Sequence, residues 1–153
     1  MVGVFLPLEH LIDPYTSPSA IIIGTGTRFG SSSAQMKSFV DSLGQLWMEN
    51  ALEGKIGSVF AGSATQHGGN ETTLWSLISA LFHLGLIVVG VPSSCKEMMG
   101  VGELSGGSPY GATYISGGDG SRKVSDNEKA IARFQGKHVA EAAKKQKLGA
   151  SLL

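Results

Sequence analysis

The sequence predicts an α/β fold built on a parallel sheet. Apolar runs typical of strands alternate with stretches in which apolar residues recur at helical spacing. The chain contains 22 glycines in 153 residues, about twice the usual share, and most of them follow the apolar runs. Strands that alternate with helices are typical of parallel sheets with helices packed on their faces. A chain of this length is expected to form a single domain over residues 1–153.

The first predicted unit is a strand, a glycine-rich loop and a helix. Residues 19–23 (Ser-Ala-Ile-Ile-Ile) form a continuous, largely β-branched run. Such a run indicates a strand that is covered on both faces. The loop at 24–30 follows, and then three serines precede a helical stripe formed by Met36, Phe39, Val40 and Leu43.

The second unit repeats this order. Residues 55–61 are predicted to form a strand and residues 62–69 a polar loop. Leu74, Leu77, Ile78 and Leu81 then form one stripe of a helix, and residues 86–91 are predicted to form a third strand. Because crossovers between parallel strands are right-handed, the polar loops should meet at the carboxyl edge of the sheet.

The last third of the chain combines a long irregular segment with a final helix. Residues 92–124 are rich in glycine and serine, and we predict neither helix nor strand there. Long irregular segments in compact domains are usually functional or disordered, and the aromatic and charged residues in this one favour function. Ser125 and Glu128 form a capping box, and a helix is predicted after it, with Ile131 and Phe134 on its apolar face.

Composition argues against several classes of partner and location. Twelve basic and twelve acidic residues give a net charge of zero, which provides no field for nucleic acid or an anionic membrane. The one cysteine, Cys95, excludes an intrachain disulfide and a cysteine-cluster metal site, and favours a reducing, cytoplasmic location. The first basic side chain is Arg28, so a signal peptide is not expected. The longest apolar run, at 84–91, is far below the ~20 residues of a membrane span.

Two loops are candidates for ligand binding. Glycines at 24–30 allow close approach of the backbone to a flat or anionic ligand, although glycines after a strand also simply form turns. The loop at 62–69 carries hydrogen-bonding side chains and one histidine, His67. This loop is longer than a usual strand-to-helix connection, and the alternative is a solvated connection without a ligand.

Other candidates have simpler alternatives. His83 lies near the end of the second helix, where histidines commonly interact with the helix dipole. Trp47 lies beyond the first helical stripe, where an aromatic residue commonly packs. No nucleophile–base–acid set is recognisable, and the four histidines are not spaced as metal ligands, which argues against hydrolytic and metal-dependent chemistry.

A series of short blocks keeps its order from about Ala20 to Ala143. The blocks lie at 24–30 (Gly-Thr-Gly-Thr-Arg-Phe-Gly), 34–41, 46–47, 52–55, 63–73, 106–113, 118–122 and 131–136. Together they resemble the WrbA family of FMN-dependent NAD(P)H:quinone oxidoreductases. The resemblance implies a flavodoxin-like three-layer sandwich with a parallel sheet, and an oligomer, dimer or tetramer, whose active sites receive residues from neighbouring subunits.

The resemblance also implies a chemistry and a set of binding residues. Hydride would pass from NAD(P)H to FMN, and two electrons would then reduce a quinone, with no catalytic residue assigned to the protein. Trp47 would line the quinone pocket. The flavin would be contacted by Thr27, Arg28, Phe29, Gly62, Ser63, Ala64, Thr65, Gln66, His67 and His83.

The chain departs from the family in ways that define a second hypothesis. Its match begins at the third strand, so the first two strands and the first turn, which holds the FMN phosphate in such folds, are expected to be absent. The third strand would then have a free edge, and we hypothesise that Val2–Leu6 pairs there. Gly26 stands where the family commonly has proline, and Leu84 where it often has histidine. The alternative function is a non-catalytic relative that acts as an interaction or oligomer partner.

Overall fold

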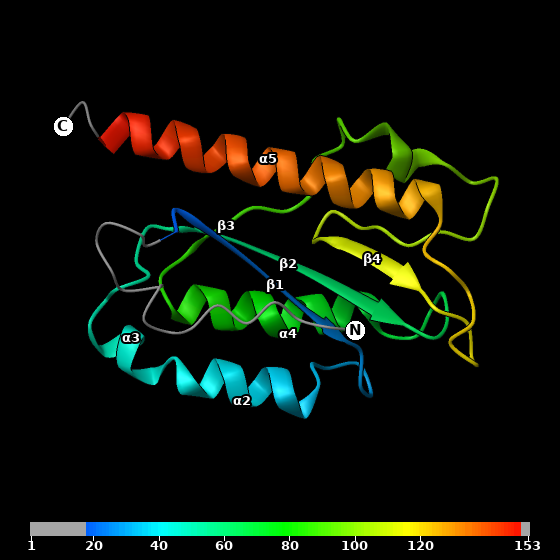
Figure 1. Cartoon of the computed structure of the whole chain (residues 1–153), viewed down its shortest axis with the longest axis horizontal. Helices are drawn as coiled ribbons and strands as arrows, with labels where there is room; N and C mark the ends of the chain where they lie inside the picture. The colour runs from blue at the N-terminus through cyan, green and yellow to red at the C-terminus, as the bar shows by residue number, and fades with distance from the viewer. Residues whose placement is uncertain (1–17, 151–153) are drawn as a thin grey trace.

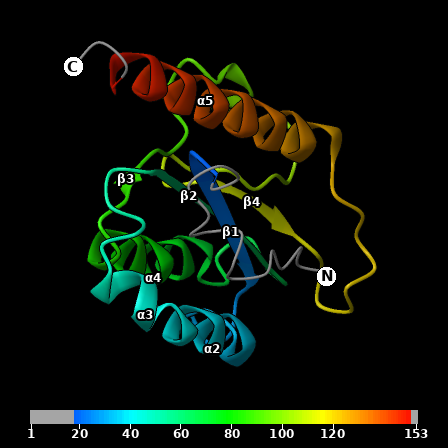
Figure 2. The same cartoon turned by 60° about the vertical axis from the view of Figure 1, so that its left-hand side comes forward.

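The computed structural model describes residues 18–150, which form a parallel sheet between two layers of helices (Figure 1). Helices α2, α3 and α4 lie on one side of the sheet and α5 lies on the other, as the turned view also shows (Figure 2). The elements are β1 (Ala20–Gly26), α2 (Ala34–Ser42), α3 (Gly44–Met48), β2 (Ile56–Ser63), α4 (Asn70–His83), β3 (Ile87–Val88), the 3₁₀ helix η1 (Lys96–Met99), β4 (Ala112–Ile115) and α5 (Asp126–Ala150).

Strand β2 is the centre of the described sheet, and every pairing in it is parallel. Strand β1 pairs with β2 from Ala20↔Ile56 to Gly26↔Gly62. On the other edge of β2, β3 pairs with its beginning and β4 with its end. The order β1-β2-β3 confirms the predicted parallel sheet. The hypothesis that Val2–Leu6 pairs with the first strand lies outside the described residues.

Two strand predictions were wrong. The strand predicted over 86–91 is reduced to Ile87–Val88. The segment at 92–124, predicted to contain neither helix nor strand, holds the 3₁₀ helix η1 and strand β4. In sequence β4 is only Ala-Thr-Tyr-Ile among glycines, which is too short for a periodic signal. It forms because Gly111 allows the chain to approach β2: a Cβ on this glycine would lie 2.2 Å from the Val59 carbonyl oxygen.

The α4 side of the sheet is held together by an apolar core. The predicted stripe of α4 is confirmed, since Leu74, Leu77, Ile78 and Leu81 are all buried against Val59 and Ile23. Burying each such side chain contributes about 1.5–3 kcal/mol. The predicted first helix is two helices, α2 and α3, separated at the buried Leu43.

The α5 side is only partly covered. The predicted capping box is confirmed, with the Ser125 N–H donating to Glu128 Oε2 and the Glu128 N–H donating to Ser125 Oγ. Helix α5 buries Ile131, Gln135 and Val139 on the face that it turns toward the sheet. Ile22 of β1 remains 41% exposed on this face, so the prediction that the first strand is covered on both faces was wrong. The reason is that α5 packs mainly over β4 and β2. In the described part of the chain, none of the helices combines the length and apolar character needed to cross a bilayer.

Candidate functional site

The two predicted ligand loops lie side by side at the carboxyl edge of β1 and β2. The Thr27 N–H donates to the Gly62 carbonyl at 2.8 Å, which joins the start of the first loop to the end of β2. Farther along, the loops pack so closely that a Cβ on Gly69 would lie 2.9 Å from Gly30 Cα. The Thr73 hydroxyl also donates to the Ser31 carbonyl at 3.3 Å. The expectation that parallel topology brings these loops together is confirmed.

The first loop holds an aromatic side chain out into solvent. Arg28 and Ser31 exchange two backbone hydrogen bonds of 2.9 and 3.0 Å, which closes a tight turn. Phe29, at the tip, has φ 52° and is fully exposed. A bulky residue in this left-handed region costs roughly 1–2 kcal/mol of conformational energy. Because the ring is exposed, packing against the described residues does not offset this cost. Such strain is typical of sites where a side chain is held ready for a ligand.

Two buried oxygens beside these loops lack hydrogen-bond partners among the described residues. They are Thr27 Oγ1, in the first loop, and Asn70 Oδ1, at the first residue of α4 directly after the second loop. Asn70 is 2% exposed. Because buried polar atoms are nearly always hydrogen-bonded, these two mark positions where a bound molecule or water would supply the missing partner.

The second loop presents its polar side chains to solvent at the same edge. Ala64, Thr65, Gln66 and His67 are exposed, whereas the strand continues through Gly62 and Ser63, which are buried. The loop bends back on itself, since Ser63 Oγ donates to the Thr65 carbonyl at 2.7 Å and the Gly68 N–H donates to it at 3.1 Å. The loop therefore offers hydroxyl, amide and imidazole groups at the same edge of the sheet as Phe29.

His83 and Trp47 lie away from this edge. His83 is the last residue of α4, so a 14-residue helix, about 20 Å long, separates it from the loops. It shares with Trp47 a groove of about 440 Å³ between α4 and the pair α2–α3, which also includes Ser32 and Asp41. Trp47 is 57% exposed, so the alternative that it simply packs does not hold, and its assignment to the quinone pocket stays a prediction. One chain thus holds the predicted binding residues in two separate groups.

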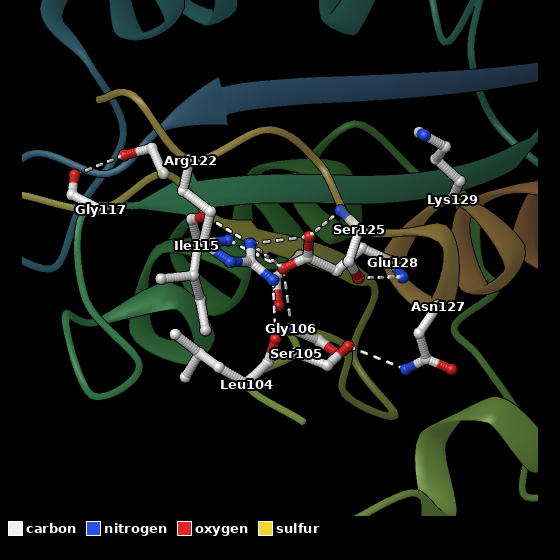
Figure 3. A network of polar contacts seen from close by, with 12 residues as sticks. Leu104, Ser105, Gly106, Ile115, Gly117, Arg122, Ser125, Asn127, Glu128 and Lys129 are labelled. Atoms are coloured by element: carbon white, nitrogen blue, oxygen red, sulfur yellow. Dashed lines mark hydrogen bonds and ion pairs between the residues drawn. The ribbon is translucent and has the colours of Figure 1, made fainter. Parts of the chain in front are cut away.

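A buried ion pair near the loops was not predicted as part of the site. Glu128 is 2% exposed, and its carboxylate accepts hydrogen bonds from Arg122 and from the backbone of Gly106, Ile115 and Ser125 (Figure 3). Burial alone would raise the pKa of this carboxyl group, but these hydrogen bonds lower it below its usual value. From the sequence, only the capping role of Glu128 was visible, because its other partners come from distant loops.

The fold places this protein in the class of parallel α/β sandwiches, in which ligands bind at the loops that follow the carboxyl ends of the strands. The crystal structure of a flavodoxin, WrbA-like protein from Agrobacterium tumefaciens matches with a TM-score of 0.63 and 24% sequence identity, covering 84% of this chain and 68% of that one. The chain therefore has a flavodoxin-like fold. The model of the family of NADPH-dependent FMN reductases matches residues 7–96, more than half of the sequence. This protein belongs to that family.

Two relatives of higher sequence identity share one named activity. The NAD(P)H dehydrogenase (quinone) of Acidithiobacillus ferrooxidans is 57% identical over 133 residues, which cover 87% of this chain and 66% of the relative. The protein of the same name from Trichlorobacter lovleyi is 56% identical over 130 residues, covering 85% of this chain and 64% of the relative. The chain thus spans just under two thirds of the length of either relative.

Proposed function

We propose that this chain acts in an FMN-dependent NAD(P)H:quinone oxidoreductase that reduces quinones by two electrons. The observation that carries the proposal is the pair of adjoining loops at the carboxyl edge, with Phe29 held on a strained turn beside the polar loop of residues 64–67. Membership of the FMN reductase family and the names of the two relatives support the same activity.

The residues at this edge fit a flavin ring. Phe29 provides an apolar surface against which a flat heterocycle can pack. Thr65 and Gln66 offer hydrogen-bonding groups to the polar edge of such a ring. The unpartnered Thr27 Oγ1 is a further group that a bound heterocycle would satisfy. We assign the flavin contacts to Thr27, Arg28 and Phe29 and to the six residues from Gly62 to His67.

In this reaction the protein binds and orients rather than supplying a nucleophile. When bound, FMN would accept hydride from NAD(P)H and deliver two electrons to the quinone. Phe29 and the second loop would hold one ring face and one edge, which determines which face stays open to the two substrates. Arg28, whose guanidinium donates to the Thr27 carbonyl at 3.0 Å, would place a positive charge at this edge of the sheet, where it would favour negative charge on the bound group.

We further propose that the protein works as a homo-oligomer, a dimer or tetramer, in the cytoplasm. His83 lies at the far end of α4 from its own chain's loops, and Trp47 shares a groove with it, so we infer that both serve a flavin and a quinone at a neighbouring copy. Their exposure and their shared groove leave them accessible to such a copy. The single cysteine, Cys95, which is buried, suits a reducing compartment.

The first experiment is a titration of the purified chain with FMN, followed by quenching of flavin fluorescence, beside an assay of NADH-dependent benzoquinone reduction. Phe29→Ala should weaken FMN binding several-fold, because an aromatic contact contributes about 0.5–1.5 kcal/mol. Phe82→Ala is the matched control, since Phe82 is also exposed but lies at the far end of α4. Equal loss of affinity in both variants, or no binding by the folded chain, would contradict the assignment.

A second function, a non-catalytic interaction partner, is favoured by a separate observation. An apolar groove of about 630 Å³ lies between α5 and the sheet, with Ile22, Phe60 and Val124 exposed along it. An apolar surface of this kind on a folded protein is typical of a site that another polypeptide covers. The same titration separates the two functions: a folded, oligomeric chain that binds no FMN would support the partner role and exclude the reductase.

A further inference from the structure

The buried polar network around Glu128 connects, through Ser116, to the residue from which the second loop begins. Arg122 Nη1 donates to Glu128 Oε2 at 2.9 Å, and its Nη2 donates to the Leu104 carbonyl at 2.6 Å. These contacts tie together α5 and two loops that flank β4, as Figure 3 shows.

Arg122 and Glu128 contact one segment of the backbone, at the carboxyl end of β4, from both sides. The Ile115 N–H donates to Glu128 Oε1 at 3.0 Å, and the Ile115 carbonyl accepts from Arg122 Nη1 at 2.6 Å. The Ser116 carbonyl accepts from the Arg122 backbone N–H at 2.9 Å. Arg122 and Glu128 therefore contact both sides of Ile115, in addition to the pairing of β4 with β2.

This peptide in turn holds the start of the second loop. The Ser116 N–H donates to the Ser63 carbonyl at 2.8 Å, and the Ser116 hydroxyl reaches the same oxygen at 3.3 Å. Ser63 is the last residue of β2, and the exposed residues 64–67 follow it. A shift of Ser116 would therefore move the point from which the loop leaves the sheet.

We propose that Arg122 and Glu128 are positioning residues for the loop of residues 63–67, and that they act through the backbone of Ile115 and Ser116. The inference rests on the proposed flavin-binding function of that loop and adds the residues that control its geometry. A buried ion pair is a weak source of net stability compared with apolar residues of the same volume. Its effect here is on where the Ser63 carbonyl and the side chains beyond it lie.

The chain offers a matched control on the same helix. Gln135 is also 2% exposed and also joins β4 to β2: it accepts from the Ala112 N–H at 2.7 Å and donates to Ser58 Oγ at 2.6 Å. It acts at the opposite end of β4, two helical turns from Glu128, and makes no bond to Ser63 or Ser116 among those found in the described residues. Loss of Gln135 should therefore cost stability without moving the loop.

The test compares Glu128→Gln, Arg122→Lys and Gln135→Ala for FMN affinity, thermal unfolding midpoint and hydrogen–deuterium exchange of residues 62–68 without flavin. Glu128→Gln should weaken FMN binding about tenfold, as expected for loss of a hydrogen bond to a charged group, and should speed exchange in the loop. Arg122→Lys keeps the charge but loses the planar guanidinium, which bonds several partners at once, and should give a smaller change in the same direction. Gln135→Ala should lower the midpoint at least as much, with FMN affinity within about twofold of the wild type.

The inference is overturned if Glu128→Gln lowers the midpoint while affinity and loop exchange stay at wild-type values, or if Gln135→Ala changes both as strongly. If Glu128→Gln does not fold, Arg122→Lys alone decides by the same two measurements. If the wild type does not bind FMN, the proposed function fails, and loop exchange in the three variants still decides whether the pair positions residues 63–67.

Discussion

The two faces of the sheet differ in the balance of apolar packing and buried hydrogen bonds, although apolar clusters lie on both. On the α4 side, leucines and isoleucines pack against β2 and β1. On the α5 side, two buried polar side chains, Glu128 and Gln135, bind the backbone of β4 and its neighbours. Apolar packing is non-directional and contributes stability, whereas buried hydrogen bonds are directional and specify register. Because the α4 side holds the largest apolar cluster, we expect it to contribute more of the folding free energy, whereas the polar side chains on the α5 side place the short strand β4.

The largest effect is expected from a cavity on the α4 side. Leu77→Ala should lower the free energy of unfolding by about 2–5 kcal/mol, because Leu77 is 1% exposed and its neighbours cannot close the space fully. Denaturant unfolding measures the change. Met48→Ala, at an exposed position on α3, should stay within about 0.5 kcal/mol of the wild type. Similar losses in both variants would show that α4 is not the main source of stability.

A smaller loss is expected on the α5 side. Gln135→Ala should cost about 1–3 kcal/mol, since the Ala112 N–H and the Val59 carbonyl lose a buried partner. The loss should be accompanied by faster amide exchange in β4 and unchanged exchange in α4. Exchange that rises equally in both elements would contradict the division of roles between the faces.

The acid dependence of stability should come from the same face. Because hydrogen bonds hold the pKa of Glu128 below its usual value in the folded protein, the carboxylate stabilises the fold above the pKa of the unfolded chain. This contribution is lost as the pH falls through the lowered pKa of the folded state. Between neutral pH and about pH 3, the free energy of unfolding should fall more steeply for the wild type than for Glu128→Gln. Parallel pH profiles would refute the role of this carboxylate.

The smallest effect is expected at the strained turn. Phe29→Gly should stabilise the protein by less than about 1 kcal/mol, because glycine adopts the positive φ of this position without strain. The same change should weaken FMN binding if the ring contacts the flavin. A variant that loses stability would show that the Phe29 ring packs in the folded protein.

Local signals predicted most of the helices and the two long strands. The capping box needs only Ser125 and Glu128, three residues apart, and the stripe from Leu74 to Leu81 repeats within one helix. The ligand loops could be predicted because they follow apolar runs and parallel strands share one carboxyl edge. His83 could be assigned to a binding role only from the resemblance, and the structure places it at the opposite end of α4.

Periodicity and local turn chemistry act over a few residues. They therefore let the sequence by itself determine the α/β class, the parallel sheet and the position of the two loops. Tertiary structure decided what depends on partners far apart in the chain. Strand β4 exists because Gly111 approaches Val59. It also depends on Gln135, which binds Ser58 and Val59 of β2 from 77 and 76 positions away in the sequence. Glu128 became more than a helix cap because folding brought Gly106, Ile115 and Arg122 to one carboxylate. Such contacts form only when the backbone of distant segments converges, and no short pattern encodes them.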